Sequence, residues 1–232
     1  SLEARKRRPS IKEDARRTGW WELDQIWRPH PGQFTIITGI PGHGKSTFIF
    51  NLIGNLARGH GMRTFIYAPE NEAHLRDTMR DIWGNKPSFD RFCAEQCFVQ
   101  SCMPDDFNSE PQDLSWVLSK AVAAIEKDRV DLLVIDPWNE LEHAKPNAML
   151  MTDYIRLRLM YLKQFCRAYG VAVILIAHPT KAVTEHGGRA PLLSDIEGSM
   201  SWYNKCDNGL VVVRDFDTRA TKIIRAKVRE RG

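Results

Sequence analysis

The residue types that could do chemistry are densest in residues 39–47, which read GIPGHGKST. The three glycines of this segment can turn successive backbone N–H groups toward one point, where they would cradle a phosphate chain. Lys45 adds a positive charge near the terminal phosphates, and Ser46 offers a hydroxyl to Mg²⁺. The segment therefore predicts a P-loop that binds a nucleotide. Its positions are Gly39, Ile40, Pro41, Gly42, His43, Gly44, Lys45, Ser46 and Thr47.

The residues on either side of this loop show which elements must position it. The apolar run 34–38 predicts a strand that leads into the loop, and the apolar residues 48–53 predict a helix that leaves it. A P-loop requires this order of strand, glycine-rich turn and helix, because the helix N-terminus favours an anion. The context therefore supports the motif.

A second apolar run, residues 132–136, reads LLVID and ends in Asp136. An acid at the carboxyl end of a buried strand predicts a Walker B aspartate, which binds Mg²⁺ directly or through water. Many buried strands end in Asp for another reason, since the side chain can cap the next helix or turn. The presence of a P-loop favours the metal role.

The catalytic carboxylate is expected after a third strand, residues 64–67, which is followed by APENE. Phosphoryl transfer to water needs a positioned nucleophile, and Glu70 is the residue expected to orient it, with Glu72 as the alternative. The end of this strand should lie beside the P-loop in a doubly wound sheet. Both acids could instead favour the dipole of the helix expected at 73–83.

His178 follows a fourth apolar strand, residues 171–177. A polar residue at this strand tip could contact the γ-phosphate and report its loss to the loop that follows. The alternative is a structural histidine with its hydrogen bonds satisfied inside the domain. The place of the strand beside the other motifs favours the sensor.

Apolar runs alternate with amphipathic stretches along the chain, which predicts an α/β domain with a mostly parallel sheet and helices on both faces. The clearest helical periodicity covers residues 116–127 and 154–169. Residues 1–18 are polar and basic, and we expect a linker arm or a disordered tail there, followed by one domain at 19–232. The expected strands are 34–38, 64–67, 97–100, 132–136, 171–177, 209–214 and 222–227.

Composition narrows the class of protein further. The sequence contains no apolar stretch of 18 residues, no signal-peptide pattern, and five cysteines without metal-ligand spacing to histidines. We therefore expect no membrane partner and a reducing compartment, either the cytosol or an organelle matrix. The net charge of +4 is weak evidence for a nucleic-acid partner, because part of the excess sits in residues 5–8 and in the last eight residues.

Four strings carry a resemblance that extends from about residue 19 to the end of the chain: GIPGHGKS, IDPWNELEH at 135–143, IAHPTK at 176–181 and SDIEGSMSWYNKCDNG at 194–209. They resemble the helicase domain of the hexameric replicative helicases of the Twinkle and phage T7 type, within the RecA-like and DnaB group. The resemblance implies a RecA-like core that hydrolyses Mg-ATP at the subunit interfaces of a hexameric ring. It also implies movement along single-stranded DNA, with 5′–3′ polarity, and unwinding of replication-fork DNA.

The resemblance implies the same site roles as the residues do. It makes Lys45 and Ser46 the phosphate and Mg²⁺ ligands, Glu70 the catalytic glutamate, Asp136 the Walker B residue and His178 the γ-phosphate sensor. It also implies that Lys227 and Arg229 enter the ATP site of the neighbouring subunit, where they would stabilise transition-state charge. The alternative for this pair is an exposed basic edge strand that prevents aggregation.

The resemblance implies that DNA binds in the ring channel through loops that follow Asp136 and His178. The expected contacts are Lys181, Arg189, Gly198 and Ser199, all to phosphate and therefore sensitive to salt. Glu197 is a departure, because the phage T7 type carries a basic residue there. The two cations could instead be solvated surface charges. Arg214, at a strand end near the site, could stack on the nucleotide base or hold a structural edge position.

Two other functions remain open from the sequence: a RecA-like recombinase, and a nucleotide-gated switch that binds DNA with little turnover. Twinkle-type proteins carry a primase or primase-derived region before the helicase domain, and nothing in this sequence could form one. We therefore expect an excised motor domain. Its assembly into hexamers should be weak, because residues 1–18 are too short and polar to serve as an intersubunit linker helix.

Overall fold

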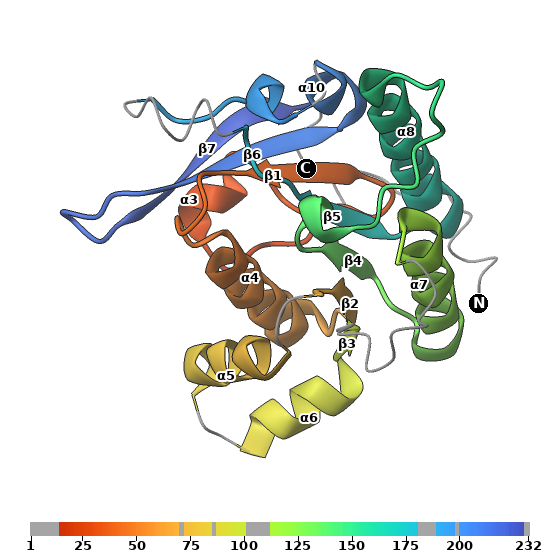
Figure 1. Ribbon diagram of the computed structural model, residues 1–232. Coiled ribbons are helices and arrows are strands. Elements are labelled where there is room, and N and C mark those ends of the chain that lie inside the picture. Colours follow the sequence, from red (N-terminus) through yellow and green to blue (C-terminus); the bar gives the residue numbers. More distant parts are fainter. Residues whose placement is uncertain are drawn as a thin grey trace.

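The central sheet consists of the strands that the apolar runs predict. The computed structural model describes residues 14–69, 72–84, 87–100, 112–180, 189–197 and 200–229, without the side chains of 72–74. Seven strands follow the order β3-β2-β4-β5-β1-β6-β7, and all neighbours are parallel except β6 and β7 (Figure 1). The strands are β1 (Phe34–Thr38), β2 (Thr64–Tyr67), β3 (Cys97–Gln100), β4 (Leu132–Ile135), β5 (Ala172–Ile176), β6 (Asn208–Arg214) and β7 (Thr221–Val228).

Helices cover both faces of the sheet, as predicted. One face packs on α3, α4, α5 and α6, and the other packs on α7, α8 and α10. The helices are α3 (Trp21–Asp24), α4 (Lys45–His60), α5 (Glu72–Trp83), α6 (Pro87–Glu95), α7 (Leu114–Asp128), α8 (Met151–Tyr169) and α10 (Ser201–Lys205). Two short 3₁₀ helices, η1 (Trp138–Glu140) and η2 (Leu193–Asp195), lie in the connections. None of the helices within the described ranges has the length and apolarity that crossing a bilayer requires.

The central strands are apolar along their whole length because the helices bury both of their faces. Every residue of β1, β2, β4 and β5 is buried, which is typical of the interior of a parallel sheet. Strand β7 is different, since it is the outermost strand of the sheet and all of its residues are exposed or half-buried. The core therefore holds the inner strands rigidly, and the hairpin of β6 and β7 extends from it.

The strand order determines which residues can meet. Strands β4, β5, β1 and β6 are consecutive neighbours and parallel, so their carboxyl ends lie at one edge of the sheet. The P-loop follows β1, Asp136 follows β4, His178 follows β5, and Arg214 ends β6. We call this the P-loop edge. Ligands collect at this edge in open α/β sheets. Strand β7 runs antiparallel to β6, so it ends where the parallel strands begin, and Arg229 lies there. We call this end of the sheet the opposite edge.

The described end of the expected arm contacts the domain. Thr18 is fully buried, and its hydroxyl donates a hydrogen bond of 2.8 Å to Asp24 Oδ1. The Asn55 side chain in α4 donates to the Thr18 carbonyl at 3.0 Å, and the Arg16 amide donates to the Pro29 carbonyl. Residues 14–18 are therefore tied to the same domain as α3 and α4, and residues 1–13 lie outside the described ranges.

Candidate functional site

The P-loop has the backbone geometry that phosphate binding needs. Gly42 and Gly44 have φ angles of 78° and 83°, in the left-handed region that favours glycine. Gly44 caps α4, so the helix N-terminus faces the loop. A side chain at Gly39 would collide with the backbone carbonyl of Val212 in β6. The sequence pattern therefore reflects two backbone turns and one close contact with the neighbouring strand.

Lys45 places its ammonium group at the mouth of this loop. Its side chain is buried, and Nζ donates to the carbonyl oxygens of Gly39 at 2.9 Å and Ile40 at 3.1 Å. The charge also reaches His43: burial, and secondly Lys45, lower the pKa of that imidazole. A polyanion at the loop would meet a lysine that is already oriented toward it. Pro41 is exposed at the tip, and Ser46 is half-buried in the first turn of α4.

His178 lies at the same edge and is held as a neutral imidazole. Burial, and secondly the charge of Lys45, lower the pKa of His178 to about 4. Its Nδ1 atom is buried and has no hydrogen-bond partner among the residues that the structure describes. Its backbone amide donates to Asn139 Oδ1 in η1 at 3.0 Å. A neutral ring beside Lys45 has a hydrogen-bonding atom available for an incoming ligand.

Sequence reasoning did not identify Asn139 as a site residue, although it belongs to the string that follows Asp136. Its side-chain oxygen joins the connection after β4 to the residue after β5. A side-chain acceptor that holds the amide of a strand tip fixes the position of that tip. Asn139 is therefore a positioning residue for His178.

Asp136 and Ser46 supply the kind of oxygen ligands that Mg²⁺ prefers. Asp136 is 7% exposed at the carboxyl end of β4, and its amide donates to the Tyr67 carbonyl at 3.0 Å. Within the described ranges, no group of three or more His, Cys, Asp or Glu side chains could hold a metal alone. A carboxylate and a hydroxyl beside a phosphate-binding loop suit an ion that takes its other ligands from phosphate and water. The residues present fit Mg²⁺ bound together with a nucleotide.

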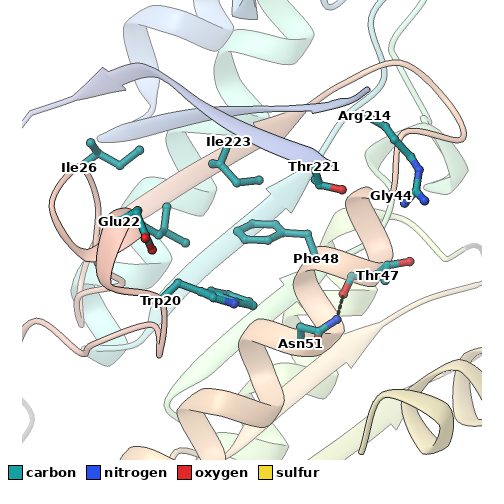
Figure 2. Close-up of a pocket in the computed structure, with 11 residues that line it drawn as sticks. Trp20, Glu22, Ile26, Gly44, Thr47, Phe48, Asn51, Arg214, Thr221 and Ile223 are labelled. Atoms are coloured by element: carbon teal, nitrogen blue, oxygen red, sulfur yellow. Dashed lines mark hydrogen bonds between the residues drawn. The ribbon is translucent and has the colours of Figure 1, made fainter. Parts of the chain in front are cut away.

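A cavity of about 370 Å³ begins at the N-terminus of α4 (Figure 2). Gly44, Thr47 and Arg214 line the end nearest the P-loop, and Trp20 and Phe48 form an apolar wall with their rings stacked 5.6 Å apart. The cavity combines a guanidinium, aromatic faces and a phosphate-binding loop, which suits the nucleoside part of a nucleotide. The α3 side of this cavity was missed by sequence reasoning, because Trp20 and its neighbours only look like the start of the core.

The tip of the β6–β7 hairpin touches the P-loop. The Arg214 amide donates to His43 Nδ1 at 3.1 Å, and the Phe216 ring meets the His43 ring edge-on with centroids 5.3 Å apart. Phe216 is otherwise exposed. The histidine of GIPGHGKS therefore fastens the loop to the hairpin, a contact that no local sequence signal indicated.

Other expected site residues lie outside the described ranges or take part in internal contacts. Glu70, Lys181, Gly198 and Ser199 are outside those ranges, and Glu72 begins α5 with its side chain not described.

Arg189 forms two hydrogen bonds to the Asp195 carboxylate, at 2.7 and 3.0 Å, and these hydrogen bonds lower the pKa of Asp195. A DNA phosphate would have to compete with Asp195 for Arg189, whose contact with DNA stays a prediction.

Lys227 and Arg229 lie far from the P-loop of their own chain. Strand β7 has eight residues, and at about 3.3 Å per residue it spans roughly 25 Å from the P-loop edge to the opposite edge. Arg229 Nη1 lies 3.7 Å from Asp207 Oδ1, and Lys227 Nζ donates to the Tyr203 and Cys206 carbonyls. Any contact of these two cations with a P-loop must therefore involve another subunit.

The AAA domain family matches residues 5–183. The Twinkle homolog protein, chloroplastic/mitochondrial, of Arabidopsis thaliana is 33% identical over 225 residues, which cover 88% of this chain and 31% of that protein. The chain thus spans about a third of the length of that relative.

Solved structures share the fold. A DnaB-like replicative helicase, described with its interactions with primase, aligns with a TM-score of 0.75 at 19% identity over 92% of this chain and 57% of that chain. A solved ATPase domain aligns with a TM-score of 0.74 at 19% identity over 93% of this chain and 84% of that chain. These structural matches confirm the RecA-like fold, and the Arabidopsis relative confirms the resemblance to the Twinkle group. The chain belongs to the AAA domain family.

Proposed function

We propose that this chain is the ATPase motor of a replicative DNA helicase, which hydrolyses Mg-ATP between subunits of a hexameric ring and moves along single-stranded DNA. The observation that carries the proposal is the separation of the two halves of the site. The P-loop, Asp136 and His178 share one edge of the sheet, and Lys227 and Arg229 occupy the opposite edge. A site divided in this way is completed when subunits associate head to tail, which generates a ring when the rotation between subunits closes. The Twinkle homologue and the DnaB-like helicase support the helicase assignment.

The expected site residues have distinct roles in the proposed reaction. The loop amides and Lys45 bind the phosphates, and Ser46 and Asp136 would hold Mg²⁺, which neutralises charge on the β- and γ-phosphates. Glu70 orients the attacking water, and His178 donates a hydrogen bond to the γ-phosphate from its neutral ring. Orientation and fixed charge are what phosphoryl transfer requires from a protein.

The cavity beside α4 would take the nucleoside of ATP. Thr47 lies next to the phosphate end, and Arg214 can stack on the base from the hairpin side. Lys227 and Arg229 would then reach the triphosphate from the neighbouring subunit and stabilise the charge that develops on the transferred group. This arrangement makes fast hydrolysis depend on assembly.

DNA is proposed to bind through the segment that follows His178. Lys181, Arg189, Gly198 and Ser199 would contact phosphates of single-stranded and replication-fork DNA, so affinity should fall as salt rises. The polarity, 5′–3′, rests on the resemblance alone. The proposed compartment is the cytosol or an organelle matrix, since the Arabidopsis relative is named chloroplastic/mitochondrial.

A nucleotide-gated DNA-binding switch is the second candidate. One observation favours it: Arg189 and Arg229 both lie against internal carboxylates, as they would in a protein that binds nucleotide without turnover. In a motor, each of these pairs must open when DNA or a neighbouring subunit arrives. The two functions therefore differ in the hydrolysis rate that assembly and DNA produce.

The deciding measurement is the steady-state ATPase rate with and without single-stranded DNA over a series of protein concentrations. A motor should be stimulated by DNA, and its rate should rise more steeply than linearly with protein. Glu70→Gln should keep ATP binding and lose hydrolysis. Nucleotide binding with a negligible rate under all conditions would instead support the switch.

Mixed oligomers test the division of the site directly. Lys45→Ala and Arg229→Ala should each be inactive alone, because one lacks the lysine that binds phosphate and the other lacks the arginine that enters the neighbouring ATP site. We call Arg229 in this role the finger. Mixing them creates some interfaces with an intact Lys45 on one side and an intact Arg229 on the other. We expect activity to reappear in the mixture, and its absence in assembled mixtures would contradict a finger that acts between subunits.

A further inference from the structure

The opposite edge of the sheet contains a buried carboxylate surrounded by three cations. Asp207 is 4% exposed at the start of β6. Its Oδ1 lies 2.6 Å from Lys163 Nζ, 3.7 Å from Arg229 Nη1 and 3.9 Å from Arg167 Nη2. Its Oδ2 accepts a hydrogen bond of 3.1 Å from the Phe34 amide at the start of β1. The acid is therefore hydrogen-bonded to the sheet, and the three positive charges around it exceed its single negative charge.

The three cations are held to different degrees. Lys163, in α8, has a side chain that is 14% exposed, and its Nζ also donates to the Lys205 carbonyl at 3.0 Å. Arg229 has a side chain that is 50% exposed, and its guanidinium lies beyond hydrogen-bond distance of Asp207. Lys163 is thus the fixed counterion of the acid, and Arg229 is a loosely held second one.

The backbone of Arg229 is also fixed beside the acid. Its amide donates to the Asp207 carbonyl at 3.1 Å, directly beyond the last pair of the ladder that joins β6 and β7. Reaching a neighbouring nucleotide therefore requires the Arg229 side chain to swing away while the strand end stays in place. When the guanidinium departs, Asp207 loses one of its counterions.

A buried carboxylate that loses its only counterion is strongly destabilised. With Lys163 in place, Arg229 can leave and Asp207 keeps a short charge-assisted hydrogen bond. Without Lys163, the acid would draw the two arginines inward, and Arg229 would be retained by its own chain. The fixed lysine lowers the cost of releasing the finger.

We infer that Lys163 is a positioning residue for catalysis in the adjacent subunit: as the permanent counterion of Asp207, it leaves Arg229 available to that subunit's nucleotide. The inference rests on the proposed function, because it takes Arg229 to be the finger. Neither the P-loop motifs nor the resemblance assigned a role to this residue of α8. In the inference, Asp207 competes with the neighbouring subunit's nucleotide for Arg229.

The first test replaces Lys163 by Met in the full chain, with turnover and nucleotide affinity measured in assembled protein on single-stranded DNA. We expect kcat to fall about tenfold, a fraction of the loss expected from Arg229→Ala, while the Kd for ATP stays unchanged. Lys163→Arg should restore most of the rate. Lys127→Met, which removes an exposed lysine of α7, is the matched control and should turn over like the parent.

The second test separates the release of the finger from a merely structural role. Lys163→Met combined with Asp207→Asn removes both buried charges, so it avoids the buried charge imbalance that could unfold the single variant. With no carboxylate to retain Arg229, the double variant should recover turnover above Lys163→Met, to within about threefold of the parent. Unfolding curves are measured beside turnover, because a structural defect would lower the free energy of unfolding of Lys163→Met in step with its rate, whereas retention of Arg229 by Asp207 would slow turnover in a stable protein.

The variants test separately the role of Lys163 and the proposed function on which it rests. If Arg229→Ala hydrolyses ATP as fast as the parent, the proposed trans finger is wrong and the inference falls with it. If Arg229→Ala is slow while Lys163→Met turns over normally, only the inference is overturned. A folded double variant that is as slow as or slower than Lys163→Met would also overturn it. Failure of Lys163→Met to fold would overturn it as well, because the inference requires the two arginines to pair with Asp207 when Lys163 is absent.

Discussion

The two edges of the sheet solve opposite electrostatic problems. At the P-loop edge, Lys45 is held by backbone carbonyls and His178 is kept neutral, so the site presents amides and one lysine charge to an anion. At the opposite edge, Asp207 gathers Lys163, Arg167 and Arg229 into ion pairs. The P-loop edge can bind a ligand that brings negative charge. At the opposite edge, the positive charges are paired with an internal acid.

The difference shows how a divided site can stay stable before its subunits meet. Cations that will act in a neighbouring subunit need a counterion in the free chain. Pairing with Asp207 supplies one and leaves no buried charge uncompensated. The P-loop needs no such counterion, because backbone dipoles and the helix N-terminus form its anion site. Experiments at both edges test this contrast.

Lys45→Ala should have the largest effect on activity. It removes the charge that faces the terminal phosphates, so hydrolysis should fall by at least about 100-fold, with weaker ATP binding. Steady-state ATPase assays and calorimetric titration with ATP measure the two effects. Lys127→Met, on the far side of the sheet, should change neither, and hydrolysis by Lys45→Ala at more than a tenth of the parent rate would contradict the role of the P-loop edge.

Asp207→Ala should have the largest effect on stability. It leaves Lys163 nearly buried without its carboxylate and removes the acceptor of the Phe34 amide, so the free energy of unfolding should fall by about 3–5 kcal/mol. Denaturant unfolding gives the value. Asp153→Ala breaks an exposed pair with Arg156 and should cost less than about 1 kcal/mol. Similar losses from the two variants would mean that the opposite edge is no more than ordinary surface.

Asn139→Ala should separate activity from stability at the P-loop edge. Loss of the hydrogen bond to the His178 amide should lower the free energy of unfolding by about 1 kcal/mol. Turnover should fall further, by about tenfold, because the sensor histidine loses its fixed position. Asn139→Asp keeps an acceptor and should retain most activity, and Glu140→Ala is the neighbouring control. An unchanged rate in Asn139→Ala would remove it from the site.

The smallest effect is a pH dependence that belongs to the histidines. Burial lowers the pKa of His43, His143 and His178, the last to about 4. Between about 6.5 and 4 the unfolded chain therefore binds more protons than the folded one, so the free energy of unfolding should fall as pH drops through this window. Unfolding curves at pH 7 and 5 should show it, with a smaller fall in His178→Asn. Greater stability at pH 5 would contradict the neutral imidazoles.

The sequence predicts the fold well because its signals are local. Each strand ends within one residue of the predicted bounds, since unbroken apolar runs such as LLVID are typical of strands buried on both faces. The P-loop was predicted for the same reason, because all its groups come from nine consecutive residues. Helix α8 was less sharply predicted, beginning at Met151 instead of Tyr154, because helix ends have weaker signals than periodic middles.

Residues that act through distant partners were not predictable in this way. Nothing local marks Asn139 as the acceptor for the His178 amide, or His43 as the contact of the β6–β7 hairpin. Nothing local marks Trp20 as part of the cavity beside α4 either. Each of these contacts joins segments at least 23 residues apart, and their meeting depends on strand order.

The sequence by itself determined the chemistry that needs only neighbours in the chain: a phosphate-binding loop, an acid at a strand end and a mostly parallel sheet. Tertiary structure alone decided that a strand of roughly 25 Å separates the P-loop edge from Arg229, and that Arg229 lies beside Asp207 and Lys163. The physical reason is the antiparallel turn of β7, which carries a basic strand end across the sheet. Charge is encoded residue by residue, but which charge faces which is a property of the assembled strands.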